Sequence, residues 1–170
     1  MADKAKVPPA FVIKAVTALR GLLLRAADRL LPAPLAAAEL GHQFARAHVL
    51  ATLWKLGVAD ALGEERVTAA ELAGRLDCDP AALHRLLRAA ATFGAVQMGS
   101  DGQFSATRLT RVLRSDDVHA VGAWCSYLCS TAHQQAWDDL ATSVRTGEPA
   151  FGRVHGQNLF EWFTSHPEQG

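Results

Sequence analysis

The stretch TAAELAGRLDCDPAALHRLLRAAATFGAVQMGSDGQFSA, residues 68–106, contains the signals that decide the fold. Thr68 and Glu71 have the spacing of a capping box, so a short helix is expected to begin there. Asp79 can cap a second helix, because Pro80 occupies the first helical position and apolar residues follow at helical spacing. The stretch is therefore expected to begin with two short helices that meet through a tight turn.

The periodicity changes after the second of these helices. Gly94 is placed to end it, and apolar residues then alternate with polar ones in 96–98 and 104–106, on either side of a turn at 99–102. This pattern predicts a small β-hairpin. Helix, turn, helix and hairpin in this order are typical of a winged helix-turn-helix, and the sequence predicts a mainly α fold that contains one.

Further helical patterns flank the winged helix on both sides. Before it, apolar residues recur at three- and four-residue spacing, and Pro32 and Pro34 are expected to separate two long helices. The expected flanking helices cover 9–31, 36–53, 58–62, 109–115, 118–144 and 158–165, with a loop over 146–157. Two parts are predicted: an N-terminal helical extension, residues 1–35, and a winged-helix domain, residues 36–170.

The composition argues against several classes of function. Of 170 residues, 49% are hydrophobic, which allows a sizeable core, and 17 Lys and Arg balance 17 Asp and Glu. A net charge of zero gives no overall field that attracts nucleic acid or an anionic membrane, so neither is an expected partner. Three cysteines without CxxC spacing argue against a disulfide framework and a zinc ribbon, and they fit a cytoplasmic location.

The first helical pattern has a membrane-bound alternative. Its apolar run near Leu19–Leu31 contains Arg20, Arg25, Asp28 and Arg29, so the run is too charged to span a bilayer. An amphipathic helix on a lipid surface is the alternative. Such a helix more often packs against another protein surface than against lipid. The long apolar faces of the helices before the winged helix therefore predict a homodimer.

Several segments together resemble the plant caffeate and acetylserotonin type O-methyltransferases and their bacterial relatives in polyketide and pigment pathways. They are ATLWKLGVADAL at 51–62, the helices and first strand at 68–96, DGQFSATRLTRVLRSD at 101–116, and AWDDLATSVRTGEPAF at 136–151 with FEWF at 160–163. The resemblance runs from about Leu40 to His166. It implies the N-terminal domain of that family, which intertwines with its twin in a homodimer and contributes residues to the substrate pocket.

The resemblance also implies a cofactor that this chain is not expected to hold. Family members use S-adenosylmethionine, bound by a doubly wound domain with a Gly-rich turn, and a histidine base in that domain deprotonates the acceptor. No G-x-G pair occurs in this sequence, so the catalytic half is expected to be absent, with no catalytic or cofactor-binding residue here. A standalone dimerising or ligand-binding module is the alternative to part of a longer enzyme.

Aromatic residues on the last long predicted helix are the candidate substrate-pocket residues. In the resembling family this helix lines the acceptor pocket, and the resemblance places Tyr127 at a substrate-facing position, with Trp124, Leu128 and His133 on the same helix. Such walls suit aromatic small-molecule acceptors, because stacking and area burial hold a flat ring without fixed polar partners. Ordinary packing is the alternative for Tyr127. For Trp137, a place in the core or in the dimer contact is the favoured interpretation.

Other reactive side chains form no recognisable site in the sequence. Cys125, Cys129 and His133 lie at i, i+4 and i+8, which spreads them over roughly 12 Å of one helix, too far to converge on one metal ion. Packed thiols are the favoured interpretation, and no metal site is expected. The remaining histidines show no acid–base spacing; among them, His155 lies near the expected junction with a further domain.

A winged helix can also bind DNA, so a transcription regulator is the third interpretation. The predicted outer face of its second helix carries Arg85 and Arg88 among alanines, and such a face reads base edges poorly. Arg108, Arg111 and Arg114 flank the wing and could contact phosphates without sequence specificity. We therefore expect this helix to be covered by protein rather than by nucleic acid.

Overall fold

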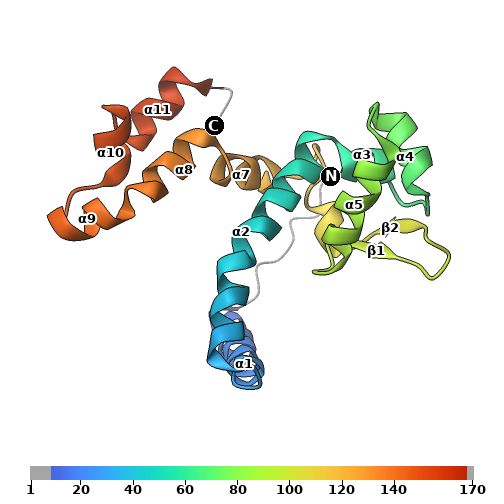
Figure 1. Ribbon diagram of the computed structural model, residues 1–170, viewed down its shortest axis with the longest axis horizontal. Coiled ribbons are helices and arrows are strands. Elements are labelled where there is room, and N and C mark those ends of the chain that lie inside the picture. The colour runs from blue at the N-terminus through green and yellow to red at the C-terminus, as the bar shows by residue number, and fades with distance from the viewer. Residues whose placement is uncertain (1–8, 168–170) are drawn as a thin grey trace. The chain divides into compact units, whose positions relative to one another are not determined.

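The structure, a computed structural model, describes residues 9–167, and the chain separates into two compact units, residues 1–43 and 44–170 (Figure 1). The elements in chain order are α1 Ala10–Asp28, α2 Ala33–Lys55, α3 Val58–Leu62, α4 Ala69–Leu76, α5 Pro80–Ala91, β1 Val96–Met98, β2 Phe104–Ala106, α6 Arg108–Arg111, α7 Val121–Leu128, α8 Thr131–Asp138, α9 Leu140–Thr146, α10 Ala150–His155 and α11 Leu159–Ser165. The predicted mainly α fold with one small hairpin is confirmed. The first eight residues of the predicted N-terminal extension lie outside the described residues.

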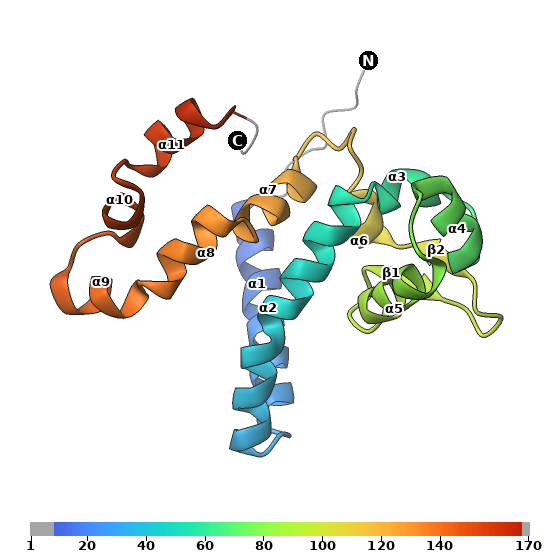
Figure 2. The ribbon, with the colours of Figure 1, turned by 45° about the horizontal axis from the view of Figure 1, so that its top comes forward.

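The first unit consists of α1 and the first half of α2, which run in opposite directions (Figure 2). No residue of α1 is buried, and Leu30 and Leu40 are 84% and 73% exposed. Pro34 lies in the first turn of α2 rather than in the linker where we expected it. The first backbone N–H groups of a helix have no helical acceptor, so a proline there costs no hydrogen bond. Within residues 9–167, no helix is long and apolar enough to cross a membrane.

The second unit begins with the winged helix, whose helix caps form as predicted. The Thr68 hydroxyl accepts a hydrogen bond from the Glu71 N–H at 3.2 Å, and the Glu71 carboxylate accepts one from the Thr68 N–H at 2.8 Å. The Asp79 carboxylate accepts a hydrogen bond from the Ala82 N–H at 2.7 Å, and Pro80 begins α5. Each cap satisfies N–H groups that the first helical turn leaves free, which fixes where α4 and α5 begin.

The predicted hairpin is also present and closes the core of the winged helix. Val96 pairs with Ala106 and Met98 with Phe104 in antiparallel register. Phe104 is completely buried, and its backbone bonds to Val67 at 2.7 and 3.0 Å. Other members of this core are Leu53, Val58, Leu62, Leu72, Leu83, Leu87 and Leu113. The winged helix therefore has a hydrophobic core of its own inside the second unit.

The single helix predicted over 118–144 is wrong, because the structure has three short helices there. The chain leaves α7 before Ser130, whose hydroxyl accepts a hydrogen bond from the His133 N–H at 3.3 Å and caps α8. A second break falls at Asp139, between α8 and α9. Serine and aspartate side chains compete for backbone hydrogen bonds, and this competition favours helix ends over helix interiors.

The segment 146–157, predicted as a loop, contains the short helix α10. Pro149 precedes it, and Gly156 ends it with a φ of 70°, in the left-handed region that glycine adopts without strain. α10 packs against α8, and Nε2 of His155 donates a hydrogen bond to the Ala132 carbonyl at 2.9 Å. The C-terminal helices thus fold back on one another instead of continuing as one rod.

A close contact between α7 and α2 anchors the C-terminal helices to the winged helix. Gly122 is buried, and a Cβ atom at this position would lie 1.9 Å from Cδ1 of Trp54. The neighbouring Val121 packs against the winged-helix core. Only glycine leaves room for the indole, so this contact fixes the start of the helix that carries Tyr127.

Candidate ligand site

A largely apolar cavity of about 360 Å³ lies among α7 to α11, the orange and red helices of Figure 1. Each of the five helices contributes to its lining, which consists of Tyr127, His133, Ala136, Trp137, Leu140, Ser143, Pro149, Ala150, Phe151 and Leu159. Cavities that hold small molecules in proteins have similar volumes and similar linings, mostly apolar with a few polar groups. This cavity is therefore the candidate site for a flat hydrophobic ligand.

Tyr127 lies at the centre of an aromatic cluster beside this cavity. Only 5% of the residue is exposed, and its ring centroid lies 4.9 Å from that of His133, 4.9 Å from that of Phe163 and 5.6 Å from that of Trp124. Burial raises the pKa of the Tyr127 hydroxyl above its ordinary value of 10.0, so the phenol is neutral at physiological pH. The ring is thus held from several sides and carries an uncharged hydroxyl.

A short chain of hydrogen bonds links three of the lining residues. The indole Nε1 of Trp137 donates to Nε2 of His133 at 2.7 Å, and Nδ1 of His133 lies 3.3 Å from the Tyr127 hydroxyl oxygen. Burial lowers the pKa of His133 below 6.5, which favours the neutral imidazole. The polar groups of this otherwise apolar wall are therefore connected to one another.

The structure brings together two of the four predicted substrate-pocket residues. Tyr127 and His133 both line the cavity and contact each other. Trp124 lies against the ring of Tyr127, but it is 57% exposed and outside the lining. Leu128 is also outside the lining, and its carbonyl accepts a hydrogen bond from the Gln134 side chain at 2.7 Å.

Trp137 does not lie in the core of the single chain, whereas the dimer contact, the other favoured place for it, stays a prediction; sequence reasoning also missed other lining residues. Trp137 is 57% exposed and lies at the cavity. Phe151 was missed because a loop was predicted over 146–157, and Leu159 was missed although it lies in the helix predicted over 158–165. A signal was present: Phe151 and His155 have the i, i+4 spacing of one helix face, with Gly156 following as a helix end.

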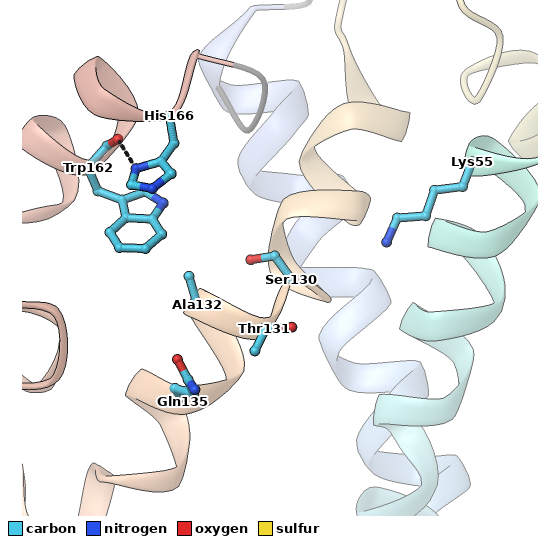
Figure 3. Close-up of a pocket in the computed structure, with 7 residues that line it drawn as sticks. All are labelled: Lys55, Ser130, Thr131, Ala132, Gln135, Trp162 and His166. Atoms are coloured by element: carbon cyan, nitrogen blue, oxygen red, sulfur yellow. Dashed lines mark hydrogen bonds between the residues drawn. The ribbon is translucent and has the colours of Figure 1, made fainter.

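A second, more polar cavity of about 460 Å³ lies beside the beginning of α8 (Figure 3). Lys55 of α2 lies across from Trp162 and His166, and the beginning of α8 lies between them. Its other lining residues are Ser130, Thr131, Ala132 and Gln135. Because it offers polar groups where the first cavity offers aromatic and aliphatic ones, the first cavity suits a flat aromatic ring better.

Imidazole and aromatic rings alternate along α10 and α11 and hold these helices together. The rings of Phe151 and His155 lie 4.5 Å apart, those of His155 and Trp162 lie 4.6 Å apart, and those of Trp162 and His166 are stacked at 3.9 Å. His155, which the sequence singled out for its place near a junction, therefore packs between two aromatic rings and bonds to α8. It has a structural role here.

The two neighbouring cysteines do not share one straight helix with His133. Cys125 lies in α7, Cys129 follows its end, and His133 lies in α8 beyond the break at Ser130. Burial raises the pKa of both thiols above 9.0, while the charge of Lys55 opposes this effect at Cys129. Both thiols are therefore protonated at neutral pH, which suits packed side chains.

The basic residues near the wing are partly neutralised. Arg111 forms an ion pair with Glu64 at 2.7 Å, and Arg114 forms one with Asp116 at 3.0 Å. Hydrogen bonds from Arg111 lower the pKa of Glu64, so that carboxylate stays charged. These pairs reduce the positive charge that phosphate binding requires, which argues against a DNA interface.

The residues described here do not fit S-adenosylmethionine. In residues 9–167 the only strands are β1 and β2, which form the hairpin, and neither leads into a Gly-rich turn and helix. The doubly wound folds that hold nucleotide cofactors place such a turn after their first strand.

The chain is similar in sequence and in fold to known proteins. The family model of the O-methyltransferase dimerisation domain matches residues 38–116. The O-demethylpuromycin-O-methyltransferase of Streptomyces alboniger is 39% identical over 114 residues, which cover 67% of this chain and 30% of that protein. The chain spans only about a third of the length of the curated relatives it matches.

Solved structures of methyltransferases are also similar to this chain. The N,N-8-amino-8-demethyl-D-riboflavin dimethyltransferase of Streptomyces davawensis is similar with a TM-score of 0.71 and 30% identity, over 82% of this chain and 42% of that one. CalO1, a methyltransferase in calicheamicin biosynthesis solved in its SAH-bound form, is similar with a TM-score of 0.68 and 31% identity, over 80% and 40% of the two chains. Residues 38–116 therefore belong to the O-methyltransferase dimerisation domain family, and the chain shares this domain with bacterial O-methyltransferases.

Proposed function

We propose that this chain is the dimerisation and acceptor-pocket part of an S-adenosylmethionine-dependent O-methyltransferase that acts on flat aromatic small molecules. Two relatives support the chemistry, because one is named as an O-demethylpuromycin-O-methyltransferase and another, a methyltransferase, was solved with SAH bound. In this proposal the chain supplies the dimer contact and one wall of the acceptor pocket. The cofactor and the catalytic base belong to a catalytic domain.

The observation that carries the proposal is the apolar cavity beside Tyr127. Its lining places Tyr127, Trp137 and Phe151 around about 360 Å³, in a chain whose preceding residues form a methyltransferase dimerisation domain. Aromatic walls stabilise a flat ring through area burial and offset stacking, each worth about 1 kcal/mol or more. An acceptor ring can thus be held here while its hydroxyl extends toward a second domain.

The exposed apolar side chains of the first unit support the dimer. In the described part of the first unit, the large apolar residues that are more than half exposed are Phe11, Val16, Leu19, Leu22, Leu23, Leu30, Leu35 and Leu40. A monomer seldom leaves so many large apolar side chains of one small unit in water. A second copy of the chain is the partner that a dimerisation domain provides, and it would cover this surface.

The acceptor pocket can be tested on the chain as it stands, by NMR titration with 1-naphthol. A ligand of this size in a half-formed pocket is expected to bind with a Kd of about 1 mM. The largest shift changes should fall on Tyr127, His133, Trp137 and Phe151. Tyr127→Ala should weaken binding at least about fivefold, the lower limit for loss of an aromatic contact.

The matched control for this titration is Phe160→Ala. Phe160 is 82% exposed and lies outside the cavity, so the same kind of truncation there should leave the Kd unchanged. Equal weakening by the two variants, or shift changes confined to other helices, would count against the pocket. S-adenosylmethionine added alone should cause no saturable shift changes, and saturation at micromolar concentration would contradict the assignment of the cofactor to another domain.

A further inference from the structure

The hydrogen-bond chain from Trp137 to Tyr127 fixes the position of each proton in it. An indole N–H can only donate, so the 2.7 Å contact makes Nε2 of His133 an acceptor. A neutral imidazole carries one N–H, which then belongs to Nδ1. Nδ1 lies 3.3 Å from the Tyr127 hydroxyl oxygen, so the imidazole donates and the phenol oxygen accepts.

The Tyr127 hydroxyl therefore receives a hydrogen bond and keeps its own proton for another acceptor. In the part of the chain that the structure describes, His133 is the only hydrogen-bond partner of this hydroxyl. The residue is 95% buried, as its 5% exposure shows, and it lines the apolar cavity. A buried donor without an acceptor raises the free energy of the folded state, and a ligand atom in the cavity can relieve this.

We propose that the Tyr127 hydroxyl donates a hydrogen bond to an oxygen atom of the ligand in this cavity, with His133 and Trp137 as positioning residues. The ligand class is thereby narrowed to flat aromatic molecules that carry a carbonyl or similar acceptor oxygen on the ring system. This inference rests on the proposed function for the assignment of the cavity to an acceptor. The inference adds the Tyr127 hydroxyl as the polar group that selects among such acceptors.

Packing supports the fixed direction of this hydroxyl. The ring of Tyr127 contacts His133 and Phe163 at the same centroid separation of 4.9 Å, so it has little freedom to turn away. A site that offers a positioned hydrogen-bond donor discriminates against an analogue without the acceptor, because the donor would stay buried and unpaired. An apolar wall without the donor would discriminate by shape alone.

The test compares 1-indanone with indane, two probes that share one bicyclic skeleton and differ by a carbonyl group. Their Kd values are measured by NMR titration with the wild-type chain and with Tyr127→Phe, which removes the hydroxyl and keeps the ring. The variant should weaken 1-indanone about three- to tenfold, the range for one hydrogen bond, and leave indane unchanged. Trp137→Phe should also lower the affinity for 1-indanone relative to indane, because the His133 tautomer is no longer fixed.

A second readout follows the imidazole itself. Nitrogen-15 shifts of His133 at neutral pH should show the proton on Nδ1 in the wild-type chain and a mixture of tautomers in Trp137→Phe. A proton on Nε2 in the wild-type chain would overturn the inference. If Tyr127→Phe affects both probes equally, the inference fails while the acceptor pocket stands. If neither probe nor 1-naphthol binds, the inference and the proposed function both fail.

Discussion

Replacing Gly122 with alanine should destabilise the chain through one identifiable clash. The added Cβ would lie 1.9 Å from Cδ1 of Trp54 and 2.5 Å from its Cγ, whereas non-bonded carbon atoms settle at about 3.5–4 Å. The indole or α7 must therefore move by about 1.5 Å. Overpacking of this kind costs about 1–3 kcal/mol, and alanine returns at most about 1 kcal/mol in helix propensity. We expect a net loss of about 1–2 kcal/mol in the free energy of unfolding.

The size of this effect should depend on Trp54. In a Trp54→Ala background the clash is gone, so Gly122→Ala should be neutral or slightly stabilising there. Urea unfolding of the four proteins in this double-mutant cycle gives the coupling free energy, which should equal the cost of the clash, about 1–3 kcal/mol. An equal cost of Gly122→Ala in both backgrounds would show that the contact with Trp54 does not set the position of α7.

Two further predictions concern the residues of the hydrogen-bond chain. Burial lowers the pKa of His133 in the folded chain below its ordinary value of 6.5. Between this lowered pKa and pH 6.5 the unfolded chain therefore binds more protons than the folded chain. The contribution of His133 to stability should be complete above pH 6.5 and should be lost as pH falls through the lowered pKa. The free energy of unfolding, measured with urea, should change less with pH in this window for His133→Gln than for the wild-type chain. An equal pH dependence in the two proteins would contradict the lowered pKa of His133. Trp137→Ala should lower the free energy of unfolding by about 1–2 kcal/mol, because Trp137 is 57% exposed. Truncation of a buried tryptophan costs roughly 3–5 kcal/mol. A loss of that size in thermal unfolding would place Trp137 in the core.

The winged helix could be predicted from the sequence because its signals are local. Thr68 with Glu71, and Asp79 with Pro80, each fix a helix start within four residues, and the hairpin follows from alternation alone. Such signals do not depend on which other part of the chain packs against them. The observed ends of these helices and strands therefore lie within a few residues of the predicted ends.

The C-terminal helices were harder to predict because their arrangement depends on contacts between distant residues. Ser130 and Asp139 fit within an uninterrupted helical pattern, and nothing local shows that α10 folds back onto α8. His155 bonds to Ala132, 23 residues away, and such a contact leaves no periodic signal in the sequence. The residues of the candidate site were hard to predict for the same reason. Tyr127 and His133 were named as pocket residues through the family resemblance, whereas Phe151 was not.

The central claim is that this chain is a dimerisation domain, and sedimentation equilibrium at tens of micromolar tests it most directly. The exposed apolar faces of α1 and α2 predict a homodimer with a mass of about 36 kDa, twice the 18.2 kDa of one chain. A single species of 18.2 kDa at that concentration would contradict the account.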